Sequence, residues 1–379
     1  MEHTRDISQT SANGRIYAHA RPTRRLHELG QSLWLDSISR KLLESGGLQR
    51  YIDEFSVTGL TSNPTIFEKA IKDSDDYDAS VRKHHAAGKS GEELLFELVL
   101  EDLTRAADLF RPVHGATRGV DGWVSLELSP KLVDDTSASV EAAVTLHARA
   151  ARPNLFIKIP GTTAGIPAIE EAIFHGVPIN VTLLFSREQY LAAAEAYMRG
   201  LERRLEAGLS LKVASVASIF ISRWDVAVEK DAPDAPRARL GIAIAKQAYR
   251  AYHHLYNLPI ARWQRLAAAG ARKQRLLWAS TGTKDPKASD TLYVEALAAP
   301  ETIDTLPEKT LEAFDDHGEL HGVMPEDGGD AEQELGDFKA LGIKPGALAA
   351  RLQEEGAKAF EDSWDDLLRS IAAKSARLG

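Results

Sequence analysis

Short apolar segments alternate along the chain with longer segments in which apolar residues recur every three or four positions. The short segments are typical of buried strands, and the longer ones are typical of amphipathic helices. We predict strands over Ser32–Ser37, Glu54–Gly59, Trp123–Leu128, Leu155–Ile159, Val177–Leu184, Lys212–Val216, Arg275–Ala279 and Thr302–Leu306. We predict crossover helices over Gly91–Phe110, Thr136–Ala151, Ser186–Ala207 and Ala235–His254. Strands that alternate with helices in this way form a parallel sheet covered by helices.

The number of strands favours one closed barrel. Eight strands that alternate with helices are the pattern of a (β/α)8 barrel, although a doubly wound open sheet has much the same periodicity. We therefore expect an α/β fold, a single (β/α)8 TIM barrel over residues 31–345. Residues 1–30 form an N-terminal extension in this prediction, and residues 346–379 form a C-terminal helical segment that packs on the barrel.

Two contrasting segments follow the last predicted strand. Asp315–Phe338 is acidic and rich in glycine, and like charges at that density repel one another unless water solvates them. We predict a solvated loop there. Apolar residues return at helical spacing over Pro345–Leu378, which predicts a long helical segment against the main body.

Composition and charge exclude several classes of function. The formal net charge of −9 is poorly suited to nucleic acid, whose binding proteins carry a basic surface. The absence of cysteine excludes disulfides, thiolate nucleophiles and cysteine-based metal sites. His84-His85 and His253-His254 are adjacent rather than four positions apart, so we expect no metal. Met1–Arg25 lacks a signal-type apolar core and no apolar run is long enough for a membrane span, so we expect a cytoplasmic protein with no membrane partner.

Lys158 is the most informative polar residue in the predicted strands. It lies in Phe156-Ile-Lys-Ile159 with apolar neighbours on both sides, in a strand that a barrel would bury. Burial disfavours the charged form of an amine, and an uncharged lysine can attack a carbonyl group. The alternative is a buried lysine that pairs with a carboxylate for structural reasons, and this segment alone does not decide between the two.

Further polar residues lie at or near the carboxyl ends of predicted strands, the edge where barrel enzymes place their chemistry. Asp36 and Glu127 are single carboxylates in apolar strands, where proton transfer is a reasonable role. Arg223 and Lys284 follow the sixth and seventh strands, where cations suit a phosphate group. The neutral groups suited to sugar hydroxyls are Asn63, Asn180, Thr182 and Ser218. Each residue alone is more often a cap, a turn residue or a surface charge, but their shared position favours a site.

Five segments together resemble the transaldolase family, in particular its longer bacterial type with an extended C-terminus. They are Val57-Thr-Gly-Leu-Thr-Ser-Asn-Pro-Thr65, Leu155-Phe-Ile-Lys-Ile-Pro-Gly-Thr162, Ile179-Asn-Val-Thr-Leu-Leu-Phe185, Ser218-Ile-Phe-Ile-Ser-Arg223 and Ala279-Ser-Thr-Gly-Thr283. The resemblance extends from about Leu33 to Leu320. It implies a (β/α)8 barrel of the pentose phosphate pathway that uses no cofactor and no metal.

The resemblance also implies a reaction and a role for each catalytic residue. Transaldolases move a dihydroxyacetone unit from sedoheptulose 7-phosphate or fructose 6-phosphate to glyceraldehyde 3-phosphate or erythrose 4-phosphate. By similarity, Lys158 forms a Schiff base with the ketose, and Asp36 is the general acid and base for the C4 hydroxyl. Glu127 and Thr182 match the pair that holds a water molecule for proton transfer.

The substrate-binding residues follow from the same motifs. Asn63, Asn180 and Ser218 are expected to hold the hydroxyls of the three-carbon unit, and Arg223 is expected to bind phosphate with help from Ser280 and Lys284. Thr61 and Phe220 lie within two of the motifs and are assigned to substrate binding with them. Shorter transaldolases carry an arginine soon after the seventh strand, where this chain has Thr283-Lys284, so the second phosphate contact is open.

Three other functions remain open from the residues. A fructose 6-phosphate aldolase would use the same scaffold and release dihydroxyacetone, although a glutamate at position 127 resembles the transaldolase pattern. A retaining glycoside hydrolase would use Asp36 and Glu127 as acid and nucleophile roughly 5 Å apart, and would leave Lys158 and Arg223 without a role. A non-catalytic sugar-phosphate binder would use Lys158 as a phosphate contact only. The sequence does not decide between a monomer and a homodimer.

Overall fold

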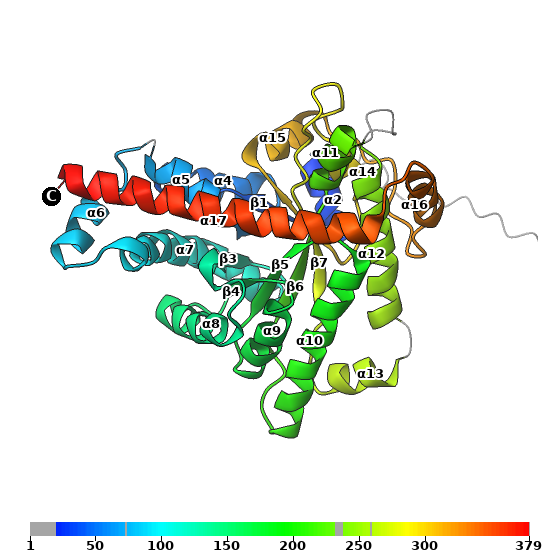
Figure 1. Ribbon diagram of the computed structural model, residues 1–379, viewed down its shortest axis with the longest axis horizontal. Helices are drawn as coiled ribbons and strands as arrows, with labels where there is room; N and C mark the ends of the chain where they lie inside the picture. Colours follow the sequence, from blue (N-terminus) through cyan, green and yellow to red (C-terminus); the bar gives the residue numbers. More distant parts are fainter. Residues whose placement is uncertain (1–19, 73, 232–237, 258–259, 379) are drawn as a thin grey trace, which may run out of the picture.

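A computed structural model describes residues 20–72, 74–231, 238–257 and 260–378, and these contain a closed barrel of parallel strands (Figure 1). The strands are β1 Ser32–Asp36, β2 Val57–Thr61, β3 Trp123–Glu127, β4 Leu155–Pro160, β5 Ile179–Leu184, β6 Ser215–Phe220, β7 Arg275–Ala279 and β8 Ile303–Leu306. Each strand pairs with the next, and β8 pairs with β1. The predicted (β/α)8 TIM barrel is confirmed.

Helices connect the strands and cover the outside of the barrel. They are α2 Pro22–Glu28, α3 Arg40–Glu44, α4 Gly47–Glu54, α5 Pro64–Lys72, α6 Asp78–Ala86, α7 Gly91–Ala116, α8 Thr136–Ala150, α9 Gly165–Phe174, α10 Arg187–Glu206, α11 Ser222–Asp231, α12 Leu240–Tyr256, α13 Ala261–Ala268, α14 Leu292–Ala296, α15 Glu308–His317, α16 Ala331–Ala340 and α17 Pro345–Leu378, with a 3-10 turn at Pro130–Leu132. Local sequence sets some of these ends. Helix α10 begins at a capping box, in which Ser186 and Gln189 bond each other's backbone amides.

Two predicted strands were displaced toward the N-terminus. Helix α4 continues to Glu54 and Ser56 has a φ of 57°, so β2 begins only at Val57. Strand β6 begins at Ser215, and the segment from Leu211 to Ala214 leads into it, with the Ala214 carbonyl accepting from the Ile179 amide at 3.2 Å. The fourth predicted helix begins at Leu240 instead of Ala235, and residues 235–237 lie outside the described residues, as do residues 1–19 of the predicted N-terminal extension.

The acidic segment Asp315–Phe338 is not a loop throughout, which corrects the prediction. Helix α15 continues into it as far as His317, and α16 begins at Ala331. Leu335 and Phe338 on α16 are buried where this helix packs against α12. Basic side chains neutralise some of these carboxylates. Asp330 lies 2.5 Å from the Lys246 amine, and Glu334 is paired with Arg239.

The barrel interior contains an apolar layer and a polar layer. Side chains on a strand alternate between the two faces of the sheet, so residues two apart point the same way. On β4 the apolar Phe156 lies nearer the amino end of the strand than Lys158 does. On β6 the apolar Val216 likewise lies nearer the amino end than Ser218. Gly59 completes the apolar layer, since a Cβ atom there would lie 2.5 Å from the Trp34 ring. The polar groups therefore gather at the carboxyl ends of the strands.

Helix α17 crosses the molecule over those carboxyl ends as one continuous helix (Figure 1). The Trp364 indole donates to Glu92 at 2.7 Å, the Ser363 hydroxyl lies 2.9 Å from the Thr65 hydroxyl, and the Lys374 amine lies 2.6 Å from Asp78. These contacts attach α17 to helices on one side of the barrel. Within the described residues, no helix has the length and apolar character needed to cross a membrane.

Candidate active site

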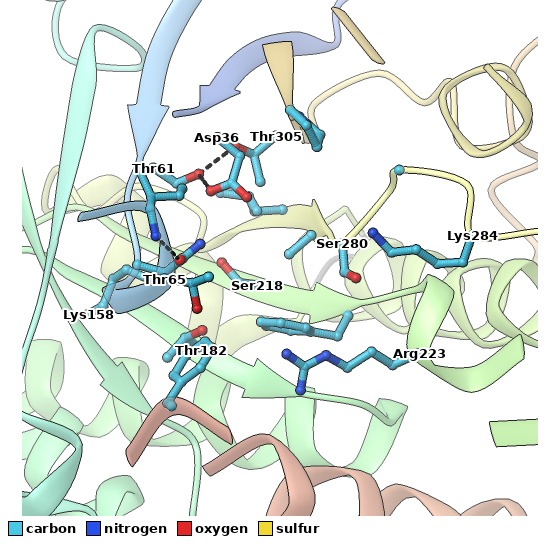
Figure 2. Close-up of a pocket in the computed structure, with 18 of the residues that line it drawn as sticks. Asp36, Thr61, Thr65, Lys158, Thr182, Ser218, Arg223, Ser280, Lys284 and Thr305 are labelled. Carbon is cyan, nitrogen blue, oxygen red and sulfur yellow. Dashed lines mark hydrogen bonds between the residues drawn. The ribbon is translucent and has the colours of Figure 1, made fainter. Parts of the chain in front are cut away.

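A cavity of about 450 Å³ opens at the carboxyl ends of the strands (Figure 2). All of the predicted site residues except Glu127 and Asn180 line it, namely Asp36, Thr61, Asn63, Lys158, Thr182, Ser218, Phe220, Arg223, Ser280 and Lys284. Glu127 and Asn180 lie directly behind its wall, each hydrogen-bonded to a residue that lines it. Figure 2 shows Lys158 and Thr182 on one side of the cavity and Arg223 and Lys284 on the other.

Lys158 is almost fully buried and is held by two acceptors. Its Nζ atom donates to Glu127 Oε2 at 2.8 Å and to the Ser62 carbonyl at 3.0 Å. Glu127 is its partner because β3 and β4 pair in a register that places the two residues side by side. The pairing with a carboxylate that a structural lysine would make is thus present. Lys158 nevertheless lines the cavity, so the pairing does not remove it from a ligand's reach.

Glu127 is poised to exchange a proton. Burial raises the pKa of this carboxyl, and the charge of Asp36 adds to the effect, although the charge and hydrogen bond of Lys158 oppose it. A carboxyl with a raised pKa takes a proton from a neighbouring ammonium group more readily. Glu127 Oε1 and Thr182 Oγ1 are both buried and have no hydrogen-bond partner among the described residues. Both atoms can therefore bind a water molecule or a ligand.

Asp36 lies at the end of β1 with a hydroxyl pair beside it. Burial raises its pKa, while the charges of Lys158 and Lys284 and the Thr61 hydrogen bond oppose the rise. The Thr61 hydroxyl lies 2.7 Å from Asp36 Oδ1 and 2.6 Å from the Thr305 hydroxyl. Asp36 lines the cavity, whereas Glu127 lies behind its wall and is hydrogen-bonded to Lys158.

A chain of neutral groups crosses neighbouring strands beneath the cavity. The Asn180 amide donates to the Ser125 hydroxyl at 3.1 Å, and the Ser218 hydroxyl donates to the Asn180 carbonyl oxygen at 2.7 Å. These bonds fix the Asn180 amide and the Ser218 hydroxyl in one orientation. Asn63 has a local role as well, since its side-chain oxygen accepts from the Ile66 amide at 3.1 Å in the first turn of α5.

Cations gather at the side of the cavity away from Lys158. The Arg223 guanidinium lies 5.2 Å from the centre of the Phe220 ring, and among the described residues it makes no hydrogen bond and no ion pair. Burial lowers its pKa, and the charge of Glu355 opposes this. Lys284 and Lys69 also line the cavity, and neither has a carboxylate within 4 Å in the described part of the chain. Unpaired cations at this density suit a phosphate group.

Sequence reasoning missed several of the residues at the site. Ser125 and Thr305 are interior residues of β3 and β8, and the two-residue period of those strands could have identified them. Lys69 is a surface lysine in α5, and Phe360 is one apolar residue among many in α17. Nothing local distinguishes these two, because their place at the cavity depends on how the helices pack.

The described residues contain no group of three or more histidine or acidic side chains that could hold a metal ion. The cavity itself offers an amine, a carboxyl, hydroxyls and cations. An amine with an adjacent carboxyl of raised pKa can form a covalent adduct with a carbonyl compound. A second carboxyl and a group of cations complete an arrangement suited to a phosphorylated carbonyl compound.

Comparisons with known proteins identify the family. A sequence model of the family described as Transaldolase/Fructose-6-phosphate aldolase matches residues 33–371. The chain is 46% identical over 366 residues to Transaldolase 2 of Streptomyces avermitilis, and the matched region covers 94% of this chain and 97% of that protein. It is 44% identical to the transaldolase of Arthrobacter sp. (strain FB24) and 43% identical to that of Thermobifida fusca, each over 94% of this chain and 98% of the relative. The resemblance read from the motifs is confirmed, and the chain belongs to the transaldolase/fructose-6-phosphate aldolase family of enzymes.

Proposed function

We propose that this protein is a transaldolase that transfers a dihydroxyacetone unit between ketose and aldose phosphates through a Schiff base on Lys158. The donors are sedoheptulose 7-phosphate or fructose 6-phosphate, and the acceptors are glyceraldehyde 3-phosphate or erythrose 4-phosphate. The observation that carries the proposal is the buried Lys158–Glu127 pair on one side of a cavity whose other side holds Arg223 and Lys284, neither of them paired with a carboxylate in the described part of the chain.

In the first step the Lys158 amine attacks the C2 carbonyl of the ketose. Glu127 takes a proton from the Lys158 ammonium group, which leaves the nitrogen with a free electron pair for the new C–N bond. The resulting carbinolamine loses its hydroxyl as water and becomes an iminium ion. A water molecule bound by Glu127 Oε1 and Thr182 Oγ1 carries the protons of this step, since both atoms lack another partner within the described residues.

In the second step the C3–C4 bond breaks. Asp36 accepts the proton of the C4 hydroxyl, and the electrons of the C3–C4 bond move to the iminium nitrogen to form an enamine. The aldose phosphate leaves with a carbonyl at C4. When an acceptor aldehyde enters, the enamine attacks it and Asp36 returns the proton to the new hydroxyl. Hydrolysis of the new iminium ion releases the product ketose.

The remaining residues hold the substrate during the exchange. Ser218 and Asn180 bind the hydroxyls of the three-carbon unit, because their own hydrogen bond already fixes their orientation. Arg223 binds the phosphate with two parallel hydrogen bonds, and Ser280 and Lys284 assist it. In this assignment Lys284 supplies the second phosphate contact that shorter members of the family obtain from an arginine.

The covalent step is tested by reduction with borohydride in the presence of fructose 6-phosphate, followed by peptide mass analysis. We expect one reduced three-carbon adduct, on the peptide that contains Lys158. Lys69→Ala is a matched control, since it removes another cavity lysine and should leave the adduct in place. A Lys158→Ala variant that still transferred carbon would refute the mechanism.

A second assay distinguishes transfer from simple cleavage. A transaldolase retains the enamine until an acceptor arrives, so fructose 6-phosphate alone should yield little free dihydroxyacetone. Addition of erythrose 4-phosphate should then give sedoheptulose 7-phosphate at a much higher rate. Release of dihydroxyacetone at the same rate with and without acceptor would instead identify a fructose 6-phosphate aldolase, the other activity in the family's description.

A further inference from the structure

A second cavity, of about 410 Å³, lies at the opposite end of the barrel from the active site. Its inner wall is formed by Trp123, Phe156 and Val216, which are the apolar residues near the amino ends of β3, β4 and β6. Its outer wall includes Trp263 on α13 and Arg272 in the segment that leads into β7. This end of a (β/α)8 barrel ordinarily contributes to stability and is filled by side chains. A cavity of this size there is large enough for a small organic molecule.

The inner wall is aromatic, formed by Trp123 and the edge of Phe156. The rings of Trp123 and Phe156 are stacked, with 4.1 Å between their centres and 23° between their planes. Trp34 continues the stack behind Phe156, with 6.2 Å between ring centres. The Trp123 indole nitrogen donates to the Gly119 carbonyl at 3.1 Å, which holds its ring in place. A planar ring could lie against this surface with its edges in contact with Val216 and Trp263.

The mouth of the cavity is positive, although the chain as a whole carries a formal charge of −9. Lys273 is neutralised by Glu301 at 2.8 Å, and Arg275 has Asp121 at 3.8 Å. Arg272 donates to the Arg118 carbonyl, and among the described residues no carboxylate lies within 4 Å of its guanidinium. A guanidinium without a counter-charge beside an apolar cavity attracts an anionic group.

We propose that this cavity is a binding site for a small aromatic anion, such as an aromatic carboxylate or sulfonate. The ring of the ligand lies against Trp123 and the edge of Phe156, and its anionic group bonds to Arg272. The inference goes beyond the transfer reaction and does not depend on it, since none of these residues lines the active-site cavity.

Residues that line the two cavities lie two positions apart on two of the strands. Phe156 precedes Lys158 by two residues on β4, and Val216 precedes Ser218 by two residues on β6, so the side chains of each pair share the interior face of the barrel. The aromatic anion and the sugar phosphate therefore occupy different layers of the same interior. Both can be bound together, and a sugar phosphate should not displace the anion.

The test is a fluorescence titration of the full chain with 8-anilinonaphthalene-1-sulfonate, an aromatic sulfonate that becomes fluorescent in apolar sites. We expect saturable binding to one site per chain. Arg272→Gln should weaken it about tenfold or more, which is the effect of losing a hydrogen bond to a charged group. Ala271→Phe should abolish it, because a ring at this half-buried position at the mouth fills the space of the ligand.

Arg265→Gln is the matched control, because Arg265 lies on the neighbouring surface of α13, is paired with Glu202 at 3.5 Å and does not line the cavity. It should leave binding unchanged, and all three variants should keep the enzyme's activity as evidence that they are folded. Binding that survived both Arg272→Gln and Ala271→Phe would overturn the proposal. So would displacement of the dye by saturating fructose 6-phosphate, which would place the dye in the active site.

Discussion

At the scale of single residues, the chemistry depends on opposing effects at the buried carboxyls. Burial raises the pKa of Glu127 and of Asp36, while the positive charge of Lys158 opposes the rise at both. Desolvation is the larger effect in each case, so the ion pair at 2.8 Å does not cancel the rise in the pKa of Glu127. A carboxyl that can hold a proton beside an amine is what Schiff-base formation requires.

The role of Asp36 separates two steps of the proposed reaction. In Asp36→Ala the Lys158 amine and Glu127 remain, so borohydride should still trap the adduct with fructose 6-phosphate. Cleavage lacks its base, and transfer should slow by about 10²–10⁴-fold. The measurement compares the yield of trapped adduct with the rate of transfer. If both fell to the same extent, Asp36 would act in adduct formation and not in cleavage.

Arg223 should act mainly on the phosphate of the substrate. Because its guanidinium has no other hydrogen-bond partner among the described residues, Arg223→Ala should lower kcat/KM for fructose 6-phosphate by about 10-fold to 100-fold. Arg223→Lys keeps the charge but loses the two parallel hydrogen bonds, so its kcat/KM should lie between those of the parent protein and Arg223→Ala. Unphosphorylated fructose serves as the control substrate, and its kcat/KM should change little. Equal losses for fructose and its phosphate would contradict the assignment.

At the scale of elements, α17 is part of the candidate active site as well as a cover for the barrel. Phe360 lines the cavity, and the Gln353 amide donates to the Leu183 carbonyl at 2.9 Å and to the Gly161 carbonyl at 3.1 Å. Leu183 has a φ of 56° near the end of β5, a backbone conformation that is strained for a leucine. The bond from Gln353 helps to hold this segment beside Thr182.

Gly356 on α17 makes room for Arg223. A Cβ atom at Gly356 would lie 3.1 Å from the Arg223 guanidinium and 3.0 Å from a Leu183 methyl group. Gly356→Ala should therefore shift the guanidinium and raise the KM for fructose 6-phosphate several-fold. Alanine is the better helix former by up to about 1 kcal/mol, so the thermal stability should be unchanged or higher.

Gly346 provides the control for this prediction. It lies in the same helix, and a Cβ atom there would meet nothing within 4 Å. Gly346→Ala should leave the KM unchanged. A rise in KM for fructose as large as that for fructose 6-phosphate in Gly356→Ala would show general damage to the site and would refute the specific effect on Arg223.

At the scale of the whole molecule, one buried carboxyl should affect stability at neutral pH. Asp304 on β8 is fully buried and accepts from the Thr281 hydroxyl at 2.8 Å, and its Oδ2 atom has no partner among the described residues. Burial raises its pKa to about 7 from the ordinary value of 3.8. Between pH 3.8 and about 7 the Asp304 carboxyl is protonated in the folded state and ionised in the unfolded state. The contribution of Asp304 to the free energy of unfolding is therefore lost as the pH rises through this range to about 7.

Asp304→Asn removes this dependence. Between pH 5 and pH 8 the free energy of unfolding of the variant should rise relative to the parent protein by up to about 3 kcal/mol. Urea unfolding at several pH values measures the difference, and Asp337→Asn, at an exposed position in α16, is the control. A difference between variant and parent that stayed constant across this pH range would show that Asp304 keeps its charge in the folded state.

Most of the barrel was predictable from local pattern, and the errors occurred where local pattern is ambiguous. The bounds of β7 and the start of α7 agree with the prediction, because their apolar runs have sharp polar boundaries. Strand β6 was placed too early because Val213 looks like a strand residue but lies in the segment before the strand. Ser218 and Phe220 therefore lie within β6, whereas the predicted strand ended before them at Val216. Helix α16 was not predicted, because the density of acidic residues indicated a loop, although Leu335 and Phe338 mark its buried face.

The sequence by itself favoured the barrel and identified the family and the strand-end residues, because strand periodicity and short motifs are local properties of the chain. Lys158, Asp36 and Arg223 could be named from it. Closure of the sheet into a barrel was decided by the tertiary structure. Only the tertiary structure decided that Glu127 is the partner of Lys158, since strand register brings together residues far apart in the chain. It also decided that α17 completes the cavity through Phe360 and Gly356. Such contacts depend on how a helix packs across the barrel, which no local pattern encodes.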